Sequence, residues 1–343
     1  MRLLDSPLYY ADLKKAVGST DLSSLDERSF FITGGLGLIA SAIVDVLLAY
    51  GRTGVIYVGA RNKAQFEKRY GNLEKVCFVS YDALKPLELD IVPDYIIHGA
   101  GLASPELYAS MPVETVLSNI DGIRELLHFA KDNLVRRVLY ISSSEVYGKK
   151  STEEPFVEGK YGEIDIDNIR SSYAIAKRAS EMICKAYTSE YEVDTVIVRP
   201  GHIFGPSAKK EDKRISSDFA FRAALGKNLE MKSSGLQKRS YCYSLDCAIQ
   251  TLTVLLKGER GQAYNIGHDE ITTIKEMADI CAKAGKVELT MADPTETELK
   301  VFNPMNNSAL DNTKVKKLGY KDVFTVEDSL IHTVEILREV ERC

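Results

Sequence analysis

The sequence predicts an α/β fold with a doubly wound parallel sheet. Two observations support this prediction: the apolar runs are nearly continuous, and they alternate with helical segments. Short, nearly continuous apolar runs alternate with segments of helical periodicity over residues 29–201. Such runs are typical of strands buried on both faces, and parallel strands need crossovers that are usually helices. The chain has 343 residues, of which 45% are hydrophobic. It is therefore long enough to bury a large core without disulfides or metals.

The predicted elements follow one another in a regular order. Apolar runs indicate six strands, which span residues 29–33, 54–60, 76–82, 94–101, 137–144 and 194–201. Apolar residues at three- and four-residue spacing indicate the main helices, which span residues 38–51, 118–134 and 171–191. A further strand near residues 263–267 is expected to return to the main sheet.

The composition divides the chain into three parts. Residues 1–28 are expected to be an N-terminal extension that carries a short amphipathic helix around Leu13 and packs on the body. Residues 29–206 contain the main α/β domain. Apolar runs shorten beyond this point, so residues 207–343 are expected to form mainly a smaller α/β part that binds substrate. One strand near 240–267 belongs to the main domain.

Charge and cysteine usage exclude several classes of partner. The net charge of −5, from 44 Lys and Arg against 49 Asp and Glu, argues against a nucleic-acid partner. The longest apolar window, residues 36–50, is too short to span a bilayer and contains Asp45. The N-terminus lacks the features of a secretory signal. The six cysteines show no metal-binding spacing, so free thiols in the cytoplasm and no metal are expected.

A glycine-rich turn follows the first predicted strand and opens the first helix. Gly34, Gly37 and Ala40 form the pattern G-x-x-G-x-x-A. Glycines let the backbone approach a pyrophosphate, and the helix N-terminus, at Leu38 and Ile39, supplies N–H groups and partial positive charge. In this strand–loop–helix setting the turn predicts a Rossmann-type dinucleotide site.

The residues after the second and third strands bear on the choice of dinucleotide. Residues 58–62 contain no acid that could bind the ribose 2′-hydroxyl of NAD. Arg61 either accommodates the 2′-phosphate of NADP, stacks on the adenine, or is a solvated surface residue. Asp82 is a candidate acceptor for the adenine amino group. NAD and NADP both stay open on this evidence.

Three further residues suggest redox chemistry on an alcohol. Tyr173 and Lys177 are four residues apart on a predicted helix, so both lie on one face. An ammonium group and a cationic nicotinamide would stabilise the phenolate, which could then take a proton from a substrate alcohol. Ser143 ends the preceding strand and is placed to align that alcohol.

Over residues 28–335, the chain resembles the extended short-chain dehydrogenase/reductases that modify nucleotide sugars. The resemblance rests on motifs in a specific order, namely TGGLGLIA (33–40), SSSEVYG (142–148), YAIAK (173–177), RPGHIFGP (199–206), Gln237-x-Arg239 with YCYSLD (241–246), YNIG (264–267) and LGY (318–320).

This resemblance implies roles for particular residues. Ser143, Tyr173 and Lys177 would form the catalytic triad, with Tyr173 and Lys177 also contacting NAD. Asn119 would support the site, and Arg239 would grip the substrate diphosphate. Members of this family usually dimerise through the helix that carries the Tyr–Lys pair and its neighbouring helix, so the resemblance also implies a homodimer.

The reaction expected from the resemblance begins with oxidation at sugar C4. Hexose 4,6-dehydratases typically carry Asp-Glu after the triad serine, whereas this chain has Ser144-Glu145. That form is similar to uronate decarboxylases and to some amino-sugar dehydratases, so Glu145 is expected to be catalytic and Ser144 to bind substrate. A 4-epimerase and a net NAD(P)-dependent oxidoreductase are the alternatives.

The chain departs from the family pattern in three places. Decarboxylases generally carry an arginine before the C-terminal Leu-Gly-aromatic motif, but residues 306–311 contain none. His202 stands where an asparagine usually contacts the sugar or phosphate, so it is a candidate substrate-binding residue. The acid after the second strand is missing. These departures predict a substrate that differs from those of the best-known members.

Overall fold

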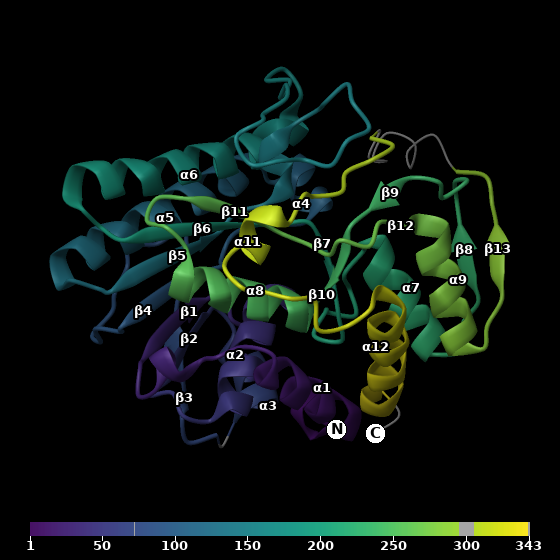
Figure 1. The fold of residues 1–343 in the computed structure, drawn as a ribbon, viewed down its shortest axis with the longest axis horizontal. Helices are drawn as coiled ribbons and strands as arrows, with labels where there is room; N and C mark the ends of the chain where they lie inside the picture. Colours follow the sequence, from purple (N-terminus) through teal and green to yellow (C-terminus); the bar gives the residue numbers. More distant parts are fainter. Residues whose placement is uncertain (72, 295–304, 342–343) are drawn as a thin grey trace.

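The computed structural model describes residues 1–71, 73–294 and 305–341, and its centre is a seven-stranded parallel sheet (Figure 1). The strand order is β11-β6-β5-β4-β1-β2-β3. The strands are β1 (Phe30–Thr33), β2 (Ile56–Ala60), β3 (Val76–Ser80), β4 (Tyr95–His98), β5 (Arg137–Ile141), β6 (Thr195–Pro200) and β11 (Ala263–Ile266). The chain runs outward from β1 in both directions, so the doubly wound fold is confirmed.

Helices cover both faces of this sheet (Figure 1). The main ones are α2 (Leu38–Tyr50), α3 (Lys63–Tyr70), α5 (Pro112–Asn133), α6 (Ser172–Tyr191) and α8 (Ser244–Lys257). Phe30 and Ile32 of β1 join a core shared with α2 and α8, whereas Phe31 joins a second core shared with α5 and α6. Successive side chains of a strand point to opposite faces, which explains why the strand sequence is apolar throughout.

Two predicted strands end earlier than their apolar runs. The run 94–101 leaves the sheet after His98 because Gly99–Gly101 turns the chain, with Gly101 at φ +156°. The run 137–144 leaves it after Ile141, and Ser143 becomes the N-cap of the short 3-10 helix η3 (Ser144–Tyr147). Polar side chains are thereby released at the carboxyl edge of the sheet.

The N-terminal residues form a helix on the outside of α2. Helix α1 (Pro7–Gly18) begins with proline at its first turn, and its N-cap Ser6 accepts a hydrogen bond from the Tyr9 amide at 3.1 Å. Tyr9 is fully buried and donates to Asp45 of α2 at 2.8 Å. The expected short helix around Leu13 is therefore present and packed on the body.

The C-terminal half contributes to two regions. Helix α8 and strand β11 complete the main sheet layer, while the remaining elements gather beside its carboxyl edge (Figure 1). These are β7 (His202–Phe204), α7 (Ile215–Ala224), β8 (Leu229–Met231), β9 (Lys238–Arg239), β10 (Tyr241–Tyr243), β12 (Thr272–Thr273), α9 (Ile274–Gly285), β13 (Leu289–Met291), α11 (Thr313–Lys316) and α12 (Val326–Glu341). The boundary at residue 206 stays a prediction.

The remaining elements are short. They are η1 (Leu3–Asp5), η2 (Ser23–Leu25), α4 (Pro105–Ser110) and η4 (Ile169–Ser171). Among these, α4 and η4 matter for function because they contact each other and flank the start of α6.

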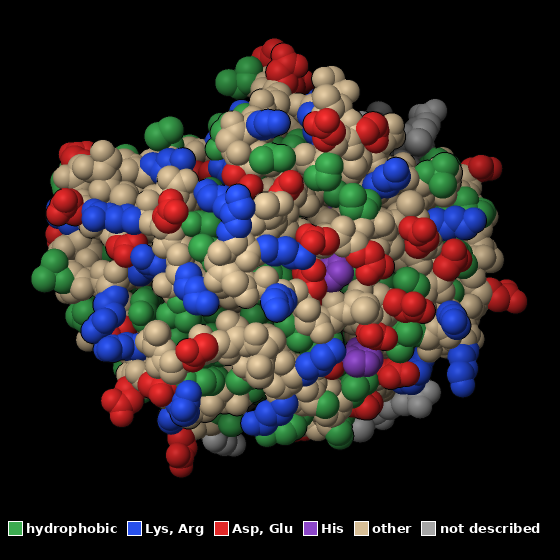
Figure 2. Space-filling model, viewed as in Figure 1, with side chains coloured by type: hydrophobic (Ala, Val, Ile, Leu, Met, Phe, Trp, Pro, Cys, Tyr) green, Lys and Arg blue, Asp and Glu red, His purple; other side chains and the backbone are tan. Residues whose placement is uncertain are grey.

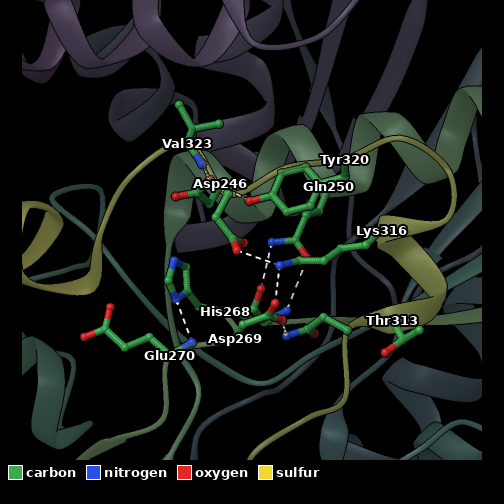
Figure 3. A network of polar contacts seen from close by, with 12 residues as sticks. Asp246, Gln250, His268, Asp269, Glu270, Thr313, Lys316, Tyr320 and Val323 are labelled. Carbon is green, nitrogen blue, oxygen red and sulfur yellow. Dashed lines mark hydrogen bonds and ion pairs between the residues drawn. The ribbon is translucent and has the colours of Figure 1, made fainter.

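A polar network fastens the loop after α11 to helix α8 (Figure 3). Asp246 accepts hydrogen bonds from the Tyr320 hydroxyl at 2.6 Å and from the Val323 amide at 2.9 Å. Lys316 pairs with Asp322 at 2.7 Å and also with Asp269. The network therefore ties helix α11 and the segment after it to α8 and to the loop after β11.

The surface shows no extended field of one charge on the face in Figure 2, where acidic and basic side chains intermingle. No helix in the described ranges is long and apolar enough to cross a membrane. Among the described cysteines, Cys184, Cys242, Cys247 and Cys281 are buried free thiols and Cys77 is an exposed one. Cys343 lies outside the described residues.

Candidate active site

The loop after β1 has the geometry of a phosphate cradle. Gly34 has φ +69°, and a Cβ there would lie 2.7 Å from the backbone oxygen of Gly99. Gly37 is exposed and caps α2 without any side-chain hydrogen bond, so the helix N-terminus opens to solvent. Leu38 is buried and Ile39 half-buried behind it. A dinucleotide pyrophosphate fits this arrangement, because only glycine allows such close approach and the first-turn amides are available.

The two residues predicted to contact the adenosine half lie on the same edge of the sheet. Arg61 is exposed and follows β2 directly, while Asp82 is half-buried just beyond β3. Asp82 also accepts a hydrogen bond from the Leu84 amide at 3.1 Å. Because β2 and β3 follow β1 in the sheet order, both residues lie to the same side of the glycine loop at the carboxyl edge.

Ser143 and Tyr173 meet where β5 ends and α6 begins. Tyr173 is 7% exposed, and its hydroxyl lies near enough to the Ser143 side chain for Ser143 to lower the pKa of Tyr173. Ser143 also accepts from the Glu145 amide at 3.2 Å. Burial raises the pKa of Tyr173 to about 12, and the nearby Ser143 hydroxyl opposes this rise.

Lys177 lies one turn further along α6 and points back toward β5. Its Nζ donates to the backbone oxygen of Ile141 at 2.8 Å and lies 5.7 Å from the centre of the Tyr173 ring. Burial lowers the pKa of Lys177 to about 7, and the charge of Glu181 opposes this effect. The predicted triad is thus brought together, with an ammonium group that titrates near neutral pH.

Asn119 occupies the middle of α5 and is fully buried. Its Nδ2 donates to the Thr115 carbonyl at 2.8 Å, and its Oδ1 has no partner among the described residues. A Cβ on Gly101 would lie 2.9 Å from that oxygen. Asn119 therefore supports the turn after β4, which forms one wall of the site.

Glu145 lies in η3, two residues after Ser143, with Ser144 half-buried between them. The Glu145 residue is exposed to solvent, yet loss of hydration raises the pKa of its carboxyl group. The charges of Arg170 and Arg239 oppose this rise. A carboxyl group that is open to solvent on one side but loses much of its hydration is typical of a concave site rather than of a convex surface.

Arg239 and His202 form the opposite wall. Arg239 is 4% exposed, and its Nη1 donates to the carbonyls of Lys238 at 2.8 Å and Met305 at 3.2 Å. His202 Nε2 lies 2.8 Å from Ser308 Oγ. Burial lowers the pKa of His202 to about 3, helped by the nearby charge of Arg239, so its ring is neutral at physiological pH.

Three residues of this site were not predicted from the sequence. Tyr108 of α4 stacks on Tyr173, with ring centres 4.4 Å apart and planes 9° apart. Arg170 of η4 and Arg214 before α7 add positive charge, since Arg170 acts on Glu145 and Arg214 acts on Tyr173. Arg170 lies three residues before Tyr173, and this spacing could have indicated that Arg170 belongs to the site. Tyr108 and Arg214 come from segments without a recognisable pattern.

Known proteins are similar to this chain in sequence. Residues 30–267 match the family described as the NAD dependent epimerase/dehydratase family. UDP-glucuronic acid decarboxylase 3 of Arabidopsis thaliana is 30% identical over 305 residues, which cover 87% of this chain and 86% of that protein. UDP-glucuronic acid decarboxylase 1 of Danio rerio is 28% identical over 93% of this chain and 75% of its own length.

The fold also agrees with solved structures. A dTDP-glucose 4,6-dehydratase of Streptomyces venezuelae, crystallised with NAD, has a TM-score of 0.76 at 24% identity and covers 91% of this chain and 97% of its own. This chain therefore belongs to the NAD dependent epimerase/dehydratase family of enzymes, and its cofactor is NAD.

Proposed function

We propose that this enzyme is a nucleotide-sugar lyase that removes the C6 carboxylate of a UDP-hexuronate after oxidising C4. The observation that carries the proposal is the placement of Glu145 beside Ser143, whose hydroxyl accepts from the Glu145 amide at 3.2 Å, with the charge of Arg170 acting on the Glu145 carboxyl group. A sugar carboxylate is an anion, and an arginine binds it with two parallel hydrogen bonds. The similarity to UDP-glucuronic acid decarboxylases supports the same reaction.

The first step is removal of the C4 hydroxyl proton by Tyr173 while Ser143 holds the same oxygen by a hydrogen bond. The glycine loop at Gly34 and Gly37 would hold bound NAD, which would provide the reversible hydride acceptor for C4. Lys177 keeps positive charge next to the phenolate, which favours its ionised form. In the NAD-free structure the pKa of Tyr173 is raised to about 12 by burial, so Tyr173 depends on such positive charge to act near neutral pH.

The second step follows from the ketone. A 4-ketone makes the C6 carboxylate a β-keto acid, so the C5–C6 bond breaks and carbon dioxide leaves with the bonding electrons retained at C5. Glu145 is placed to protonate C5 or to orient the carboxylate before it leaves. Its raised pKa favours a protonated fraction larger than that of a solvated glutamate.

The substrate contacts are assigned from the same geometry. Arg239 presents a buried guanidinium for the diphosphate, since only its Nη1 has hydrogen-bond partners among the described residues. The neutral His202 and Ser144 would contact the sugar or phosphate. Residues 306–311 contain no arginine, so Arg170 would instead supply the cation that binds the sugar carboxylate.

The decisive experiment is incubation of the purified enzyme with UDP-glucuronate and with UDP- and dTDP-glucose, followed by mass spectrometry of the products. We expect carbon dioxide and the corresponding UDP-pentose, with no net change in NADH absorbance. Tyr173→Phe should abolish turnover and still bind NAD. A 4-keto-6-deoxy product from a hexose would instead establish the dehydratase, and a product of unchanged mass the 4-epimerase. Stoichiometric NADH formation would indicate a net oxidoreductase.

The role of Arg170 has its own test. In the inactive Tyr173→Phe background, Arg170→Met should weaken UDP-glucuronate binding about tenfold or more and UDP-glucose binding far less. A charge-assisted hydrogen bond contributes about 1.5–3 kcal/mol. Arg52→Met, which removes an exposed arginine between α2 and β2, is the matched control. Equal losses for both sugars would contradict a carboxylate contact.

We also propose that the enzyme is a cytoplasmic homodimer that associates through α5 and α6. Both helices carry exposed apolar side chains, including Leu117 at 43% and Met182 at 64% exposure. Exposed apolar groups on adjacent helices are typical of an association surface. Light scattering should give a mass near twice 38.1 kDa. Met182→Glu should yield a monomer, and an unchanged mass would place the interface elsewhere.

A further inference from the structure

A buried ion pair joins helix α6 to the sheet directly behind the triad. Glu181 lies one turn after Lys177 and is 5% exposed, and Arg199 of β6 is 1% exposed. Arg199 grips the carboxylate with two hydrogen bonds, from Nε at 2.9 Å and from Nη2 at 2.6 Å. Ser142, the residue before Ser143, donates to the same carboxylate at 2.6 Å.

The guanidinium of Arg199 extends this contact to the other elements around the site. Its Nη1 donates to the Tyr147 hydroxyl at 3.0 Å, and Tyr147 ends the 3-10 helix that begins with Ser144. The Tyr147 hydroxyl in turn donates to Asn265 of β11. One carboxylate therefore links α6, the end of β5, β6 and, through Tyr147, the segment that carries Glu145.

We propose that Glu181 is a positioning residue which, together with Arg199 and Ser142, locks the end of β5 against α6 and so keeps Ser143 and Lys177 in one geometry. The proposal deepens the proposed function, on which it rests. A buried ion pair costs desolvation that an apolar pair would avoid, so its presence behind a reactive group calls for a role other than stability. Here the role is to hold Ser143 and Lys177 in fixed positions, with the Glu181 carboxylate near the Lys177 ammonium.

The charge of Glu181 also acts on Lys177. The groups that face the Lys177 ammonium are Tyr173, Glu181 and Cys184 on α6, Tyr140 on β5 and His98 on β4. Burial lowers the pKa of His98 to about 3, so its ring is neutral at physiological pH, and the carboxylate of this set is that of Glu181, which pairs with Arg199. Loss of this anion lowers the pKa of Lys177 further, and a less charged Lys177 stabilises the Tyr173 phenolate less.

The test is a pH titration of tyrosinate ultraviolet absorbance in the NAD-loaded enzyme. The chain has 18 tyrosines, so the curve of a matching Tyr173→Phe protein is subtracted to isolate Tyr173. In Glu181→Gln we expect the Tyr173 step to move upward by about one pH unit, the size expected for a nearby charge. Glu181→Asp should restore most of the change.

Asp45→Asn is the matched control, because it also removes a buried carboxylate from a pair, with Arg69, but far from the triad. It should leave the Tyr173 step unchanged. If Glu181→Gln does not fold, the double variant Glu181→Gln/Arg199→Gln leaves no charge unpaired and should show the same upward shift. An unchanged or lowered Tyr173 step, or an equal shift in Asp45→Asn, overturns the proposal. The titration needs no sugar, so failure of the proposed reaction would be seen separately.

Discussion

Lys177 should lower the free energy of unfolding of this protein, because folding buries its charged ammonium group. Burial lowers its pKa from 10.5 to about 7. At about 1.4 kcal/mol per pH unit, this difference corresponds to about 5 kcal/mol of unfavourable free energy below pH 7. Lys177→Met keeps the length and removes the charge, but it leaves the Ile141 carbonyl without its donor at a cost of about 1–3 kcal/mol. The variant should therefore be more stable by about 2–4 kcal/mol.

The sign of the pH dependence is specific. Below pH 7 the lysine is protonated in both the folded and the unfolded chain, so the gain from Lys177→Met is complete. Between pH 7 and 10.5 the unfolded chain binds more protons than the folded one, so the wild-type protein gains stability as the pH rises. The advantage of the variant should shrink over this interval and cross zero between about pH 8.5 and 10. Near pH 10.5 the variant should be less stable by about 1–3 kcal/mol, because only the lost hydrogen bond remains there.

Urea unfolding of the NAD-free proteins from pH 6 to 10 tests this, followed by far-ultraviolet circular dichroism because the chain has no tryptophan. Lys185→Met, at a half-buried lysine of the same helix, is the control and should show no comparable trend. The reasoning is refuted if Lys177→Met is less stable than wild type near pH 6, or if its gain does not vary with pH.

Two further substitutions probe the cofactor loop and the N-terminal helix. Gly34→Ala should lose NAD affinity at least tenfold, because a left-handed alanine costs about 1–2 kcal/mol and its Cβ meets the Gly99 carbonyl. Calorimetric NAD binding measures this, and wild-type affinity would contradict the assigned cradle. Asp45→Asn should lower the free energy of unfolding by about 3–5 kcal/mol, because it leaves the Arg69 guanidinium without its anion. Denaturant unfolding that detects no loss would show that the pair is dispensable.

Local spacing accounts for what could be predicted. The alternation of apolar runs and helices, the Gly34-x-x-Gly37 turn and the Tyr173–Lys177 interval each depend on residues a few positions apart. The parallel arrangement of the strands followed from the rule that parallel strands need crossovers, whereas their order in the sheet was not predicted. Strand ends were predicted less well, because residues 99–101 and 142–144 continue the apolar or small-residue character after the sheet has ended.

By itself, the sequence determined the doubly wound fold, the dinucleotide loop and the group of Ser143, Tyr173 and Lys177, because period and spacing encode them locally. Only the tertiary structure decided what surrounds that group. Tyr108 reaches Tyr173 across about 65 residues of chain, and Arg199 reaches Glu181 from the next strand. The pKa of Lys177 is set by burial among several elements. Packing brings such distant groups together and excludes water from them, and neither effect is recorded in the spacing of residues along the chain.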